Sequence, residues 1–199
     1  MIKTGIYGGA FNPIHNGHIA LTQHIMQQAG LDEIWFVVAP QNPLKPSSAL
    51  LDDSLRRDME RKALEPYPGL VASDVEFSLP RPSYMWHTLQ SLTHFTDRSF
   101  SLIIGADNWK CFDRWYRAAD IVAHYPIVVY PREGCDIDTA TLPPTVRLVD
   151  TPLYNVSSTE IRADVQAGRD ISGKGPACIA DDAKRLYNDK KLKTHKALY

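Results

Sequence analysis

The chain has 199 residues, of which 44% are hydrophobic and 23% charged, and these values favour one folded domain over a disordered chain. Its formal net charge of -1 disfavours a protein that binds nucleic acid mainly through a basic face. The three cysteines are widely spaced and show no metal-ligand pattern, which disfavours both a disulfide framework and a zinc site.

Six short apolar runs rich in β-branched residues predict strands. They cover residues 2–7, 34–39, 71–75, 100–104, 127–130 and 146–149. Several of these runs are apolar throughout, a pattern typical of strands that are covered on both faces. We therefore expect a sheet buried in the middle of the molecule.

Helical patterns lie between these strands. Leu21, Ile25 and Ala29 share one face of a first helix, and Gly30 is placed to end it. Further helices are expected at residues 52–65, 84–95 and 158–167. The alternation predicts an α/β fold with a doubly wound, mainly parallel sheet and helices on both faces. Ligands of such a sheet bind beyond the carboxyl ends of its strands.

Three segments are expected to lie outside this framework. Residues 40–49 contain three prolines and predict a loop that could close over a site, and residues 136–144 predict a surface connection. Residues 181–199 predict a polar helix followed by a lysine-rich tail, so that a single domain spans residues 1–199. No window approaches the ~18 apolar residues of a membrane span, and the first residues lack a leader pattern. The sequence therefore predicts a cytoplasmic protein without membrane partners.

The most informative segment joins the first strand to the first helix and reads GGAFNPIHNGH over residues 8–18. Its glycines let the backbone approach a ligand closely. His15 and His18 stand at the start of the helix, where free N–H groups attract anions. Imidazoles placed there can donate hydrogen bonds to phosphate oxygens, and a bound triphosphate would favour their charged form.

Other interpretations of this segment fit less well. It lacks the Gly-Lys-Ser/Thr ending of a Walker A loop, and its glycine spacing does not fit the GxGxxG dinucleotide fingerprint. The plain alternative is two surface histidines beside an ordinary turn.

The segment resembles the signature GxFxPxHxGH of the HxGH nucleotidyltransferase superfamily, which is related to class I aminoacyl-tRNA synthetases. Every fixed position is present, at Gly9, Phe11, Pro13, His15, Gly17 and His18. The resemblance implies a Rossmann-like fold in which the two histidines bind triphosphate and stabilise charge as pyrophosphate leaves. It also implies ATP contacts along the start of the segment, at Gly8, Gly9, Ala10 and Phe11.

A second signal lies at residues 156–162, VSSTEIR, which resemble the superfamily motif ISSTxIR. Ser157 or Ser158 can cap the helix that follows, and the nearby glutamate supports a capping arrangement. The resemblance implies that Ser157, Ser158 and Thr159 face the β- and γ-phosphates of ATP and that Arg162 supplies a fixed charge. A plain helix cap would explain the serines alone.

Within the superfamily the chain most resembles the bacterial nicotinate-nucleotide adenylyltransferases, over nearly its whole length. Residues 103–108, IIGADN, match the family's GAD segment, which implies that Gly105 and Asp107 lie beside the adenosine. Trp115 and Tyr116 match the family's Trp-Tyr pair. The match implies that Trp115 stacks on the nicotinate ring and that the Tyr116 backbone N–H meets its carboxylate. A core role is the alternative for Trp115.

Residues 81–89, RPSYMWHTL, resemble the family's PSYTxDTL segment, with Met85 in place of threonine and His87 in place of aspartate. The resemblance implies that Tyr84, Met85 and Thr88 line the mononucleotide pocket, although ordinary helix packing would give the same spacing.

Residues 40–46, PQNPLKP, resemble the family's loop after the second strand. The resemblance implies that Asn42 contacts the mononucleotide and that the flexible ammonium of Lys45 reaches a phosphate. Arg132, which follows the fifth strand, is a candidate for the acceptor phosphate. An exposed arginine without a special role is its alternative.

The implied reaction is attack by the 5′-phosphate of nicotinate mononucleotide on the α-phosphorus of ATP, giving deamido-NAD and pyrophosphate in NAD biosynthesis. His15, His18, Lys45 and Arg162 would supply the catalytic donors. Mg²⁺ would bind through substrate phosphates and water, so no protein metal ligands are expected. The alternatives are a pantetheine-phosphate adenylyltransferase, a small cytidylyltransferase, and a non-catalytic nucleotide- or RNA-binding module. The sequence predicts no oligomeric state.

Overall fold

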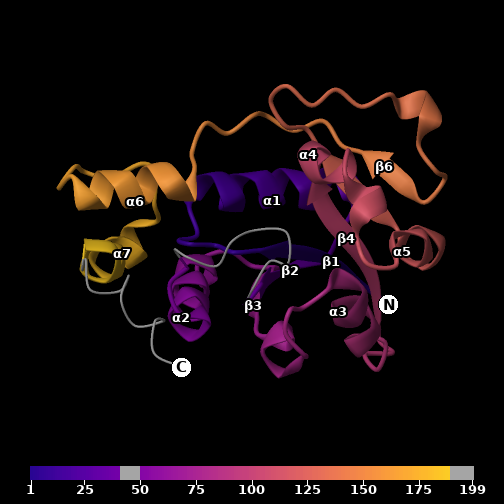
Figure 1. The fold of residues 1–199 in the computed structure, drawn as a ribbon, viewed down its shortest axis with the longest axis horizontal. Helices are drawn as coiled ribbons and strands as arrows, with labels where there is room; N and C mark the ends of the chain where they lie inside the picture. Colours follow the sequence, from indigo (N-terminus) through magenta and orange to yellow (C-terminus); the bar gives the residue numbers. More distant parts are fainter. Residues whose placement is uncertain (41–49, 189–199) are drawn as a thin grey trace.

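The computed structural model describes residues 1–40 and 50–188. Its centre is a six-stranded sheet in the order β3-β2-β1-β4-β5-β6, in which all neighbouring strands are parallel (Figure 1). The strands are β1 (Ile2–Gly9), β2 (Glu33–Val38), β3 (Leu70–Ser73), β4 (Arg98–Gly105), β5 (Ile127–Tyr130) and β6 (Val146–Leu148). This order is that of the doubly wound Rossmann-like arrangement, and its direction reverses between β1 and β4.

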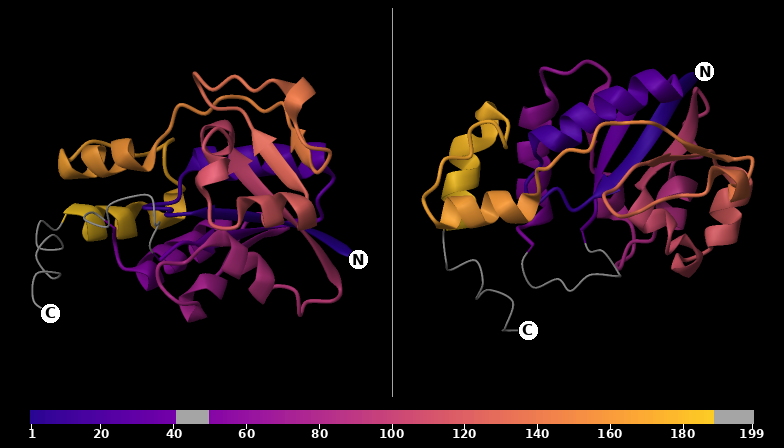
Figure 2. Two further views of the ribbon diagram at one scale, coloured as in Figure 1. Left: turned by 45° about the vertical axis from the view of Figure 1, so that its right-hand side comes forward. Right: turned by 90° about the horizontal axis from the view of Figure 1, so that it is seen from above.

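The described residues form seven α-helices around this sheet and at one end of the molecule. They are α1 (Asn16–Ala29), α2 (Asp53–Leu64), α3 (Met85–Ser91), α4 (Ala106–Trp109), α5 (Ala118–His124), α6 (Ser158–Gln166) and α7 (Ala180–Asn188). Short 3-10 helices occupy Val75–Ser78, Phe112–Arg114, Thr139–Thr141 and Ala177–Ile179. In Figures 1 and 2, α6 and α7 lie side by side at one end of the molecule.

Alternate residues of the central strands enter two separate hydrophobic cores. Tyr7 of β1 and Ile103 of β4 pack with α1, α2, α6 and α7 on one face of the sheet. Ile6 and Leu102 pack with α3 and α5 on the other face. Successive side chains of a strand point to opposite faces of the sheet. Because both faces are covered, all of them must be apolar, which explains the continuous apolar runs in the sequence.

Most predicted elements are present, with shifted ends. The first helix ends at Gly30 as predicted, in the left-handed conformation with φ of 62°. The helix predicted at residues 84–95 is shorter, because the chain turns after Leu92 toward β4. Val75 was expected to end a strand but begins a 3-10 helix, and this turns Glu76 inward. The sequence did not predict α4 and α5, which are too short to show a helical period.

In the part of the chain that the structure describes, no helix is both long enough and apolar enough to cross a membrane. The polar helix predicted from residue 181 corresponds to α7, which begins at Ala180. The tail that follows lies outside the described residues, and the single-domain organisation stays a prediction.

Candidate active site

A cavity of about 540 Å³ opens at the carboxyl ends of β1, β4 and β5, where the strand order reverses. His15 and His18, at the start of α1, form one wall, and Asp107 of α4 and Arg132 after β5 form another. Residues 152–158, which lead into α6, line the remaining side. The sheet therefore gathers four segments that are far apart in sequence around one opening.

The two histidines cap α1 reciprocally. His15 is the N-cap residue, and its Nδ1 accepts the backbone N–H of His18 at 3.3 Å. In return the Nδ1 of His18 accepts the backbone N–H of His15 at 3.2 Å. A capping box usually pairs serine or threonine with glutamate or glutamine, so here two imidazoles do the same work. The HxGH spacing is thus also the spacing that closes the first turn of the helix.

This arrangement fixes the protonation of both rings. The imidazoles stack with centroids 3.5 Å apart. Because each Nδ1 accepts a hydrogen bond, the single proton of each neutral ring lies on Nε2. Burial, followed by the charge of Arg132, lowers the pKa of His15 to about 4. Burial, then His15 and Arg132, holds the pKa of His18 well below its usual range. In the free protein each ring therefore offers one neutral Nε2–H donor.

We expect both imidazoles to be Nε2–H tautomers in the free protein, with His15 titrating near pH 4 instead of 6.5. The unfolded chain binds this proton more readily, so the stability contributed by neutral His15 is present above pH 6.5 and lost as pH falls toward 4. Two-dimensional NMR of the ring nitrogens tests both points. A proton on Nδ1, or a midpoint near 6.5 for His15, would contradict the capping geometry.

The charged form that a triphosphate was expected to favour stays a prediction, because it concerns the bound state. The capping bonds oppose it, since a second proton on either ring must sit on an Nδ1 that already accepts a backbone N–H. Donation from neutral Nε2–H groups needs no such change.

Helix α6 brings the VSSTEIR segment, residues 156–162, against the segment of residues 8–18, called the histidine loop below. Ser157, one of the two residues predicted as its cap, is its N-cap, and the Oγ of Ser157 accepts a backbone N–H of the first turn at 3.1 Å. The Oγ of Ser158 donates to the Pro13 carbonyl at 2.8 Å. The Nη1 of Arg162 donates to the Asn12 carbonyl at 2.7 Å. Two side chains of α6 therefore hold the backbone that leads to His15.

The residues of this motif do not all face the cavity. Ser157 and Ser158 line it, whereas Thr159 and Arg162 do not. The Oγ1 of Thr159 instead accepts a hydrogen bond from Nη2 of Arg162 at 3.2 Å. In the free protein Arg162 thus holds the loop, and its predicted contact with ATP stays a prediction.

Asp107 and Arg132 face each other across the cavity rim, with Oδ1 and Nε 3.5 Å apart. Both side chains are about half exposed, so a ligand can compete for either charge. A Cβ on Gly105 would lie 2.4 Å from Oδ1 of Asp107 and 3.1 Å from Nε of Arg132, so only glycine leaves room for this pair.

Tyr7 and Tyr130 are among the cavity residues that the sequence did not single out. Tyr7 and Tyr130 line the floor, and their ring centroids are 6.1 Å apart. The guanidinium carbon of Arg132 lies 5.3 Å from the ring centroid of Tyr130. Burial raises the pKa of the Tyr7 hydroxyl well above its usual value, so the hydroxyl stays protonated. A tyrosine near the carboxyl end of a buried strand was the available signal, because its hydroxyl needs a polar neighbour there.

The start of the histidine loop is shaped by Phe11, a buried non-glycine residue with φ of 41°. Its ring lies edge-on to those of Tyr7 and His18, with centroids 5.4 and 5.1 Å away. A Cβ on Gly9 would lie 2.8 Å from the Phe11 ring, so glycine is required there. The Phe11 ring therefore packs against the imidazole of His18. The neighbouring Ala10 carbonyl accepts a hydrogen bond from the buried Arg56.

Three residues predicted to bind the mononucleotide lie together beside the end of β1. Tyr84 and His87 have ring centroids 5.0 and 5.3 Å from that of Tyr116, which is 48% exposed. Met85 sits against Gly8, where a Cβ would lie 2.8 Å from the Met85 Cε. Tyr84, Met85 and Tyr116 are thus close together but do not line the cavity.

Trp115 and Thr88 differ from this group. Trp115 packs on Phe112 with ring centroids 5.0 Å apart, and its indole Nε1 has no hydrogen-bond partner among the described residues. Thr88 is fully buried, and its hydroxyl donates to Oε1 of Glu76 at 2.7 Å. In the free protein the Thr88 hydroxyl is therefore engaged by Glu76, which the 3-10 turn directs inward, and its predicted contact with the mononucleotide stays a prediction. Asn42 and Lys45 lie outside the described residues.

The comparisons with known proteins identify the family and the fold of this chain. The cytidylyltransferase-like family matches residues 6–164. A protein of Bacteroides fragilis named a probable nicotinate-nucleotide adenylyltransferase is 49% identical over 170 residues, which cover 85% of each chain. A protein of Flavobacterium johnsoniae with the same name is 41% identical over 173 residues, covering 85% of this chain and 90% of its own.

Solved structures show the same fold. The nicotinic acid mononucleotide adenylyltransferase of Plasmodium falciparum complexed with NaAD has a TM-score of 0.72 at 21% identity, covering 97% of this chain and 96% of its own. The same protein complexed with APC has a TM-score of 0.76 at 20% identity, covering 94% and 98%. With the relatives at 49% and 41% identity, these findings establish that the chain belongs to the nicotinate-nucleotide adenylyltransferases, within the cytidylyltransferase-like family.

Proposed function

We propose that the protein transfers AMP from ATP to nicotinate mononucleotide, giving deamido-NAD and pyrophosphate in NAD biosynthesis. The observation that carries the proposal is the capped histidine pair at the edge of the cavity. Both histidines line the same cavity as Ser157 and Ser158 at the start of α6, and their capping bonds leave each Nε2–H free of the cap. Two helix N-termini and two neutral imidazoles suit a triphosphate, because all of them provide donors without demanding a counter-charge.

The proposed reaction depends on the positions of the two phosphates and needs no general base. The attacking 5′-phosphate is already an anion, so no side chain has to remove a proton before attack. Catalysis then consists of holding the two phosphates in line and neutralising charge as pyrophosphate departs. His15 and His18 would donate to the departing phosphates, and Arg132 at the rim supplies a permanent positive charge.

We propose that Mg²⁺ enters with ATP. Among the residues that the structure describes, no group of three or more His, Cys, Asp or Glu side chains could hold a metal ion. Mg²⁺ commonly binds through phosphate oxygens and water, so the proposal needs no all-protein ligand set. When bound there, the ion would neutralise charge on the phosphates.

We propose that the acceptor's pyridine ring binds near Trp115 and the cluster of Tyr84, His87 and Tyr116. Aromatic faces favour a flat cationic ring, which supports this placement of the pyridine. Met85, the neighbour of Tyr84 in the chain, lies against Gly8 at the end of β1, which supports a position for the acceptor near that strand end.

The purified protein is expected to release pyrophosphate from ATP and Mg²⁺ when nicotinate mononucleotide is the acceptor. Nicotinamide mononucleotide and phosphopantetheine, offered separately, should give at most weak turnover, because they lack the carboxylate or the pyridine ring. Continuous detection of pyrophosphate measures all three. Turnover with another acceptor alone would refute the proposed substrate, and nucleotide binding without turnover on any acceptor would refute the proposed enzyme.

A further inference from the structure

The loop between α6 and α7 returns to the first turn of α1. The backbone N–H of Asn16 donates to the Lys174 carbonyl at 2.9 Å. The Asn16 side-chain amide donates to the carbonyls of Gly173 and Gly175 at 3.1 and 3.4 Å. Asn16 is the residue between the histidine that caps α1 and Gly17. Three carbonyls of one loop therefore hold the middle of the HxGH segment.

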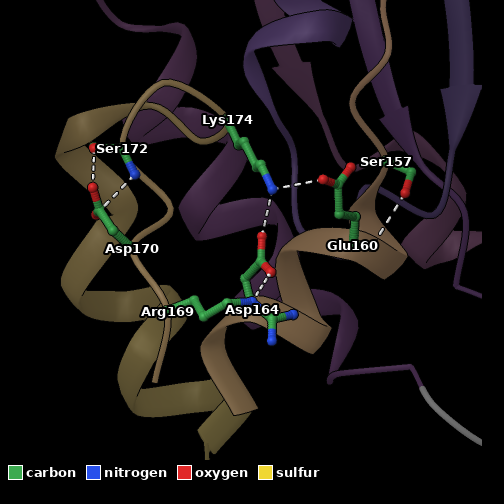
Figure 3. A network of polar contacts seen from close by, with 7 residues as sticks. All are labelled: Ser157, Glu160, Asp164, Arg169, Asp170, Ser172 and Lys174. Carbon is green, nitrogen blue, oxygen red and sulfur yellow. Dashed lines mark hydrogen bonds and ion pairs between the residues drawn. The ribbon is translucent and has the colours of Figure 1, made fainter. Parts of the chain in front are cut away.

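The same loop is anchored on α6 by the side chain of Lys174 (Figure 3). Its Nζ donates to Oε1 of Glu160 and to Oδ2 of Asp164, at 2.6 Å in each case. The Asp164 side chain is only 6% exposed, and its Oδ1 also accepts from Nε of Arg169 at 2.7 Å. Hydrogen bonds from Lys174 and then Arg169 hold the pKa of Asp164 below its usual value, so Asp164 is charged at neutral pH.

Hydrogen bonds within the loop between α6 and α7 define the shape of residues 170–173. The Asp170 carboxylate accepts the Ser172 backbone N–H at 3.0 Å and also its hydroxyl (Figure 3). Gly173 then takes φ of 83°, in the left-handed region that glycine enters without strain. The Lys174 side chain pairs with residues of α6, and the Lys174 carbonyl accepts the Asn16 backbone N–H. A shift of that side chain would therefore also move the carbonyl that holds Asn16.

These contacts join α6 to the segment around His15 at two places. Helix α6 touches the histidine loop directly, through Ser158 on the Pro13 carbonyl and Arg162 on the Asn12 carbonyl. Lys174 joins the same helix to the loop a second time, on the other side of His15. The histidine pair and the start of α6 are thus fixed relative to each other from both sides.

We propose that Lys174 is a positioning residue for ATP, which sets the distance between the histidine donors and the serine donors at the start of α6. The inference rests on the proposed function, in which both segments bind the triphosphate. Lys174 does not line the cavity and acts only through Asn16 and α6. Placement errors of about 1 Å in such a site can cost roughly 10²-fold in rate, so a tether of this kind has a measurable role.

Lys174→Met keeps the aliphatic stem and removes both ion pairs. We expect it to raise the KM and the Kd for ATP about five- to tenfold, with the KM for nicotinate mononucleotide changed less than twofold. Lys174→Arg should restore most of the affinity, since it can still bridge Glu160 and Asp164. Asn16→Ala removes the side-chain hydrogen bonds to the Gly173 and Gly175 carbonyls at the other end of the link and keeps the backbone hydrogen bond to Lys174, so it should weaken ATP binding in the same direction.

Lys62→Met is the matched control, because Lys62 pairs with Asp182 at 2.5 Å between α2 and α7, away from the cavity. It should leave the ATP constants unchanged. Calorimetric titration of ATP gives the Kd without turnover, so a wild-type protein that binds ATP but makes no product would refute the proposed function alone. An unchanged ATP Kd in both Lys174→Met and Asn16→Ala, or equal changes for both substrates, would refute the role of Lys174.

Discussion

Replacing His18 by alanine is expected to lower kcat for pyrophosphate release by roughly 10²- to 10³-fold, the usual cost of losing one donor to developing charge. The ring lies against His15 with centroids 3.5 Å apart, and its Nε2–H is free of the capping contact. The KM values should change much less, because the donor is needed most where charge builds up on the departing pyrophosphate. Steady-state kinetics with nicotinate mononucleotide as acceptor measures the effect.

The alanine variant alone is ambiguous, because His18 also accepts the His15 backbone N–H. Glutamine is a usual residue at this position of a capping box, so His18→Gln should keep the helix start and the melting temperature while removing the imidazole. We expect kcat to fall at least about tenfold in this variant as well. Full activity of His18→Gln would mean that the ring serves the helix cap and not the reaction.

The strands of the sheet could be predicted from the sequence, because a strand that is buried on both faces is an unbroken apolar run. Ile6 and Tyr7 are adjacent, yet they enter opposite cores, so the run that contains them is apolar without a break. The helix end at Gly30 was predictable, and the N-cap of α6 was narrowed to Ser157 or Ser158, because a left-handed helix end and an N-cap each depend on one residue and its immediate neighbours.

The contacts across the fold could not be predicted in this way. The pattern that placed Thr88 in a pocket is local, whereas its burial depends on Glu76, which a 3-10 turn directs inward. The same holds for Arg162, whose partner Asn12 is 150 residues away in sequence. Local spacing identified the motif residues, but their roles depend on partners that only the tertiary structure brings close.

Arg56→Met is expected to lower the free energy of unfolding by about 3–5 kcal/mol, the range for removing one member of a buried charged arrangement. Arg56 is 1% exposed. Its Nε donates to the Leu51 carbonyl at 2.9 Å, and its Nη1 donates to the Ala39 carbonyl at 3.1 Å and to that of Ala10. It therefore joins the loop after β1, the end of β2 and the start of α2. Methionine fills the volume but leaves these carbonyls without their donor.

Glu60 lies one helical turn from Arg56, and neither of its buried carboxylate oxygens has a hydrogen-bond partner within the described residues. Burial raises the pKa of Glu60 well above its usual value, and the charge of Arg56 opposes that rise. Removing Arg56 thus also removes the nearest compensation for this carboxylate. Glu60→Leu in the Arg56→Met background should recover part of the loss, because it eliminates the buried acid.

Urea denaturation of these variants separates a buried arginine with a structural role from an ordinary surface charge. Arg185→Met is the control, since Arg185 is 68% exposed and pairs with Asp182 one turn away, so its loss should change stability by less than about 1 kcal/mol. Arg56→Lys keeps one charge but lacks the fork that reaches three carbonyls, and should fall between wild type and Arg56→Met. A change below about 1 kcal/mol for Arg56→Met would mean that the carbonyls find water instead, and that the loop after β1 does not depend on this cation.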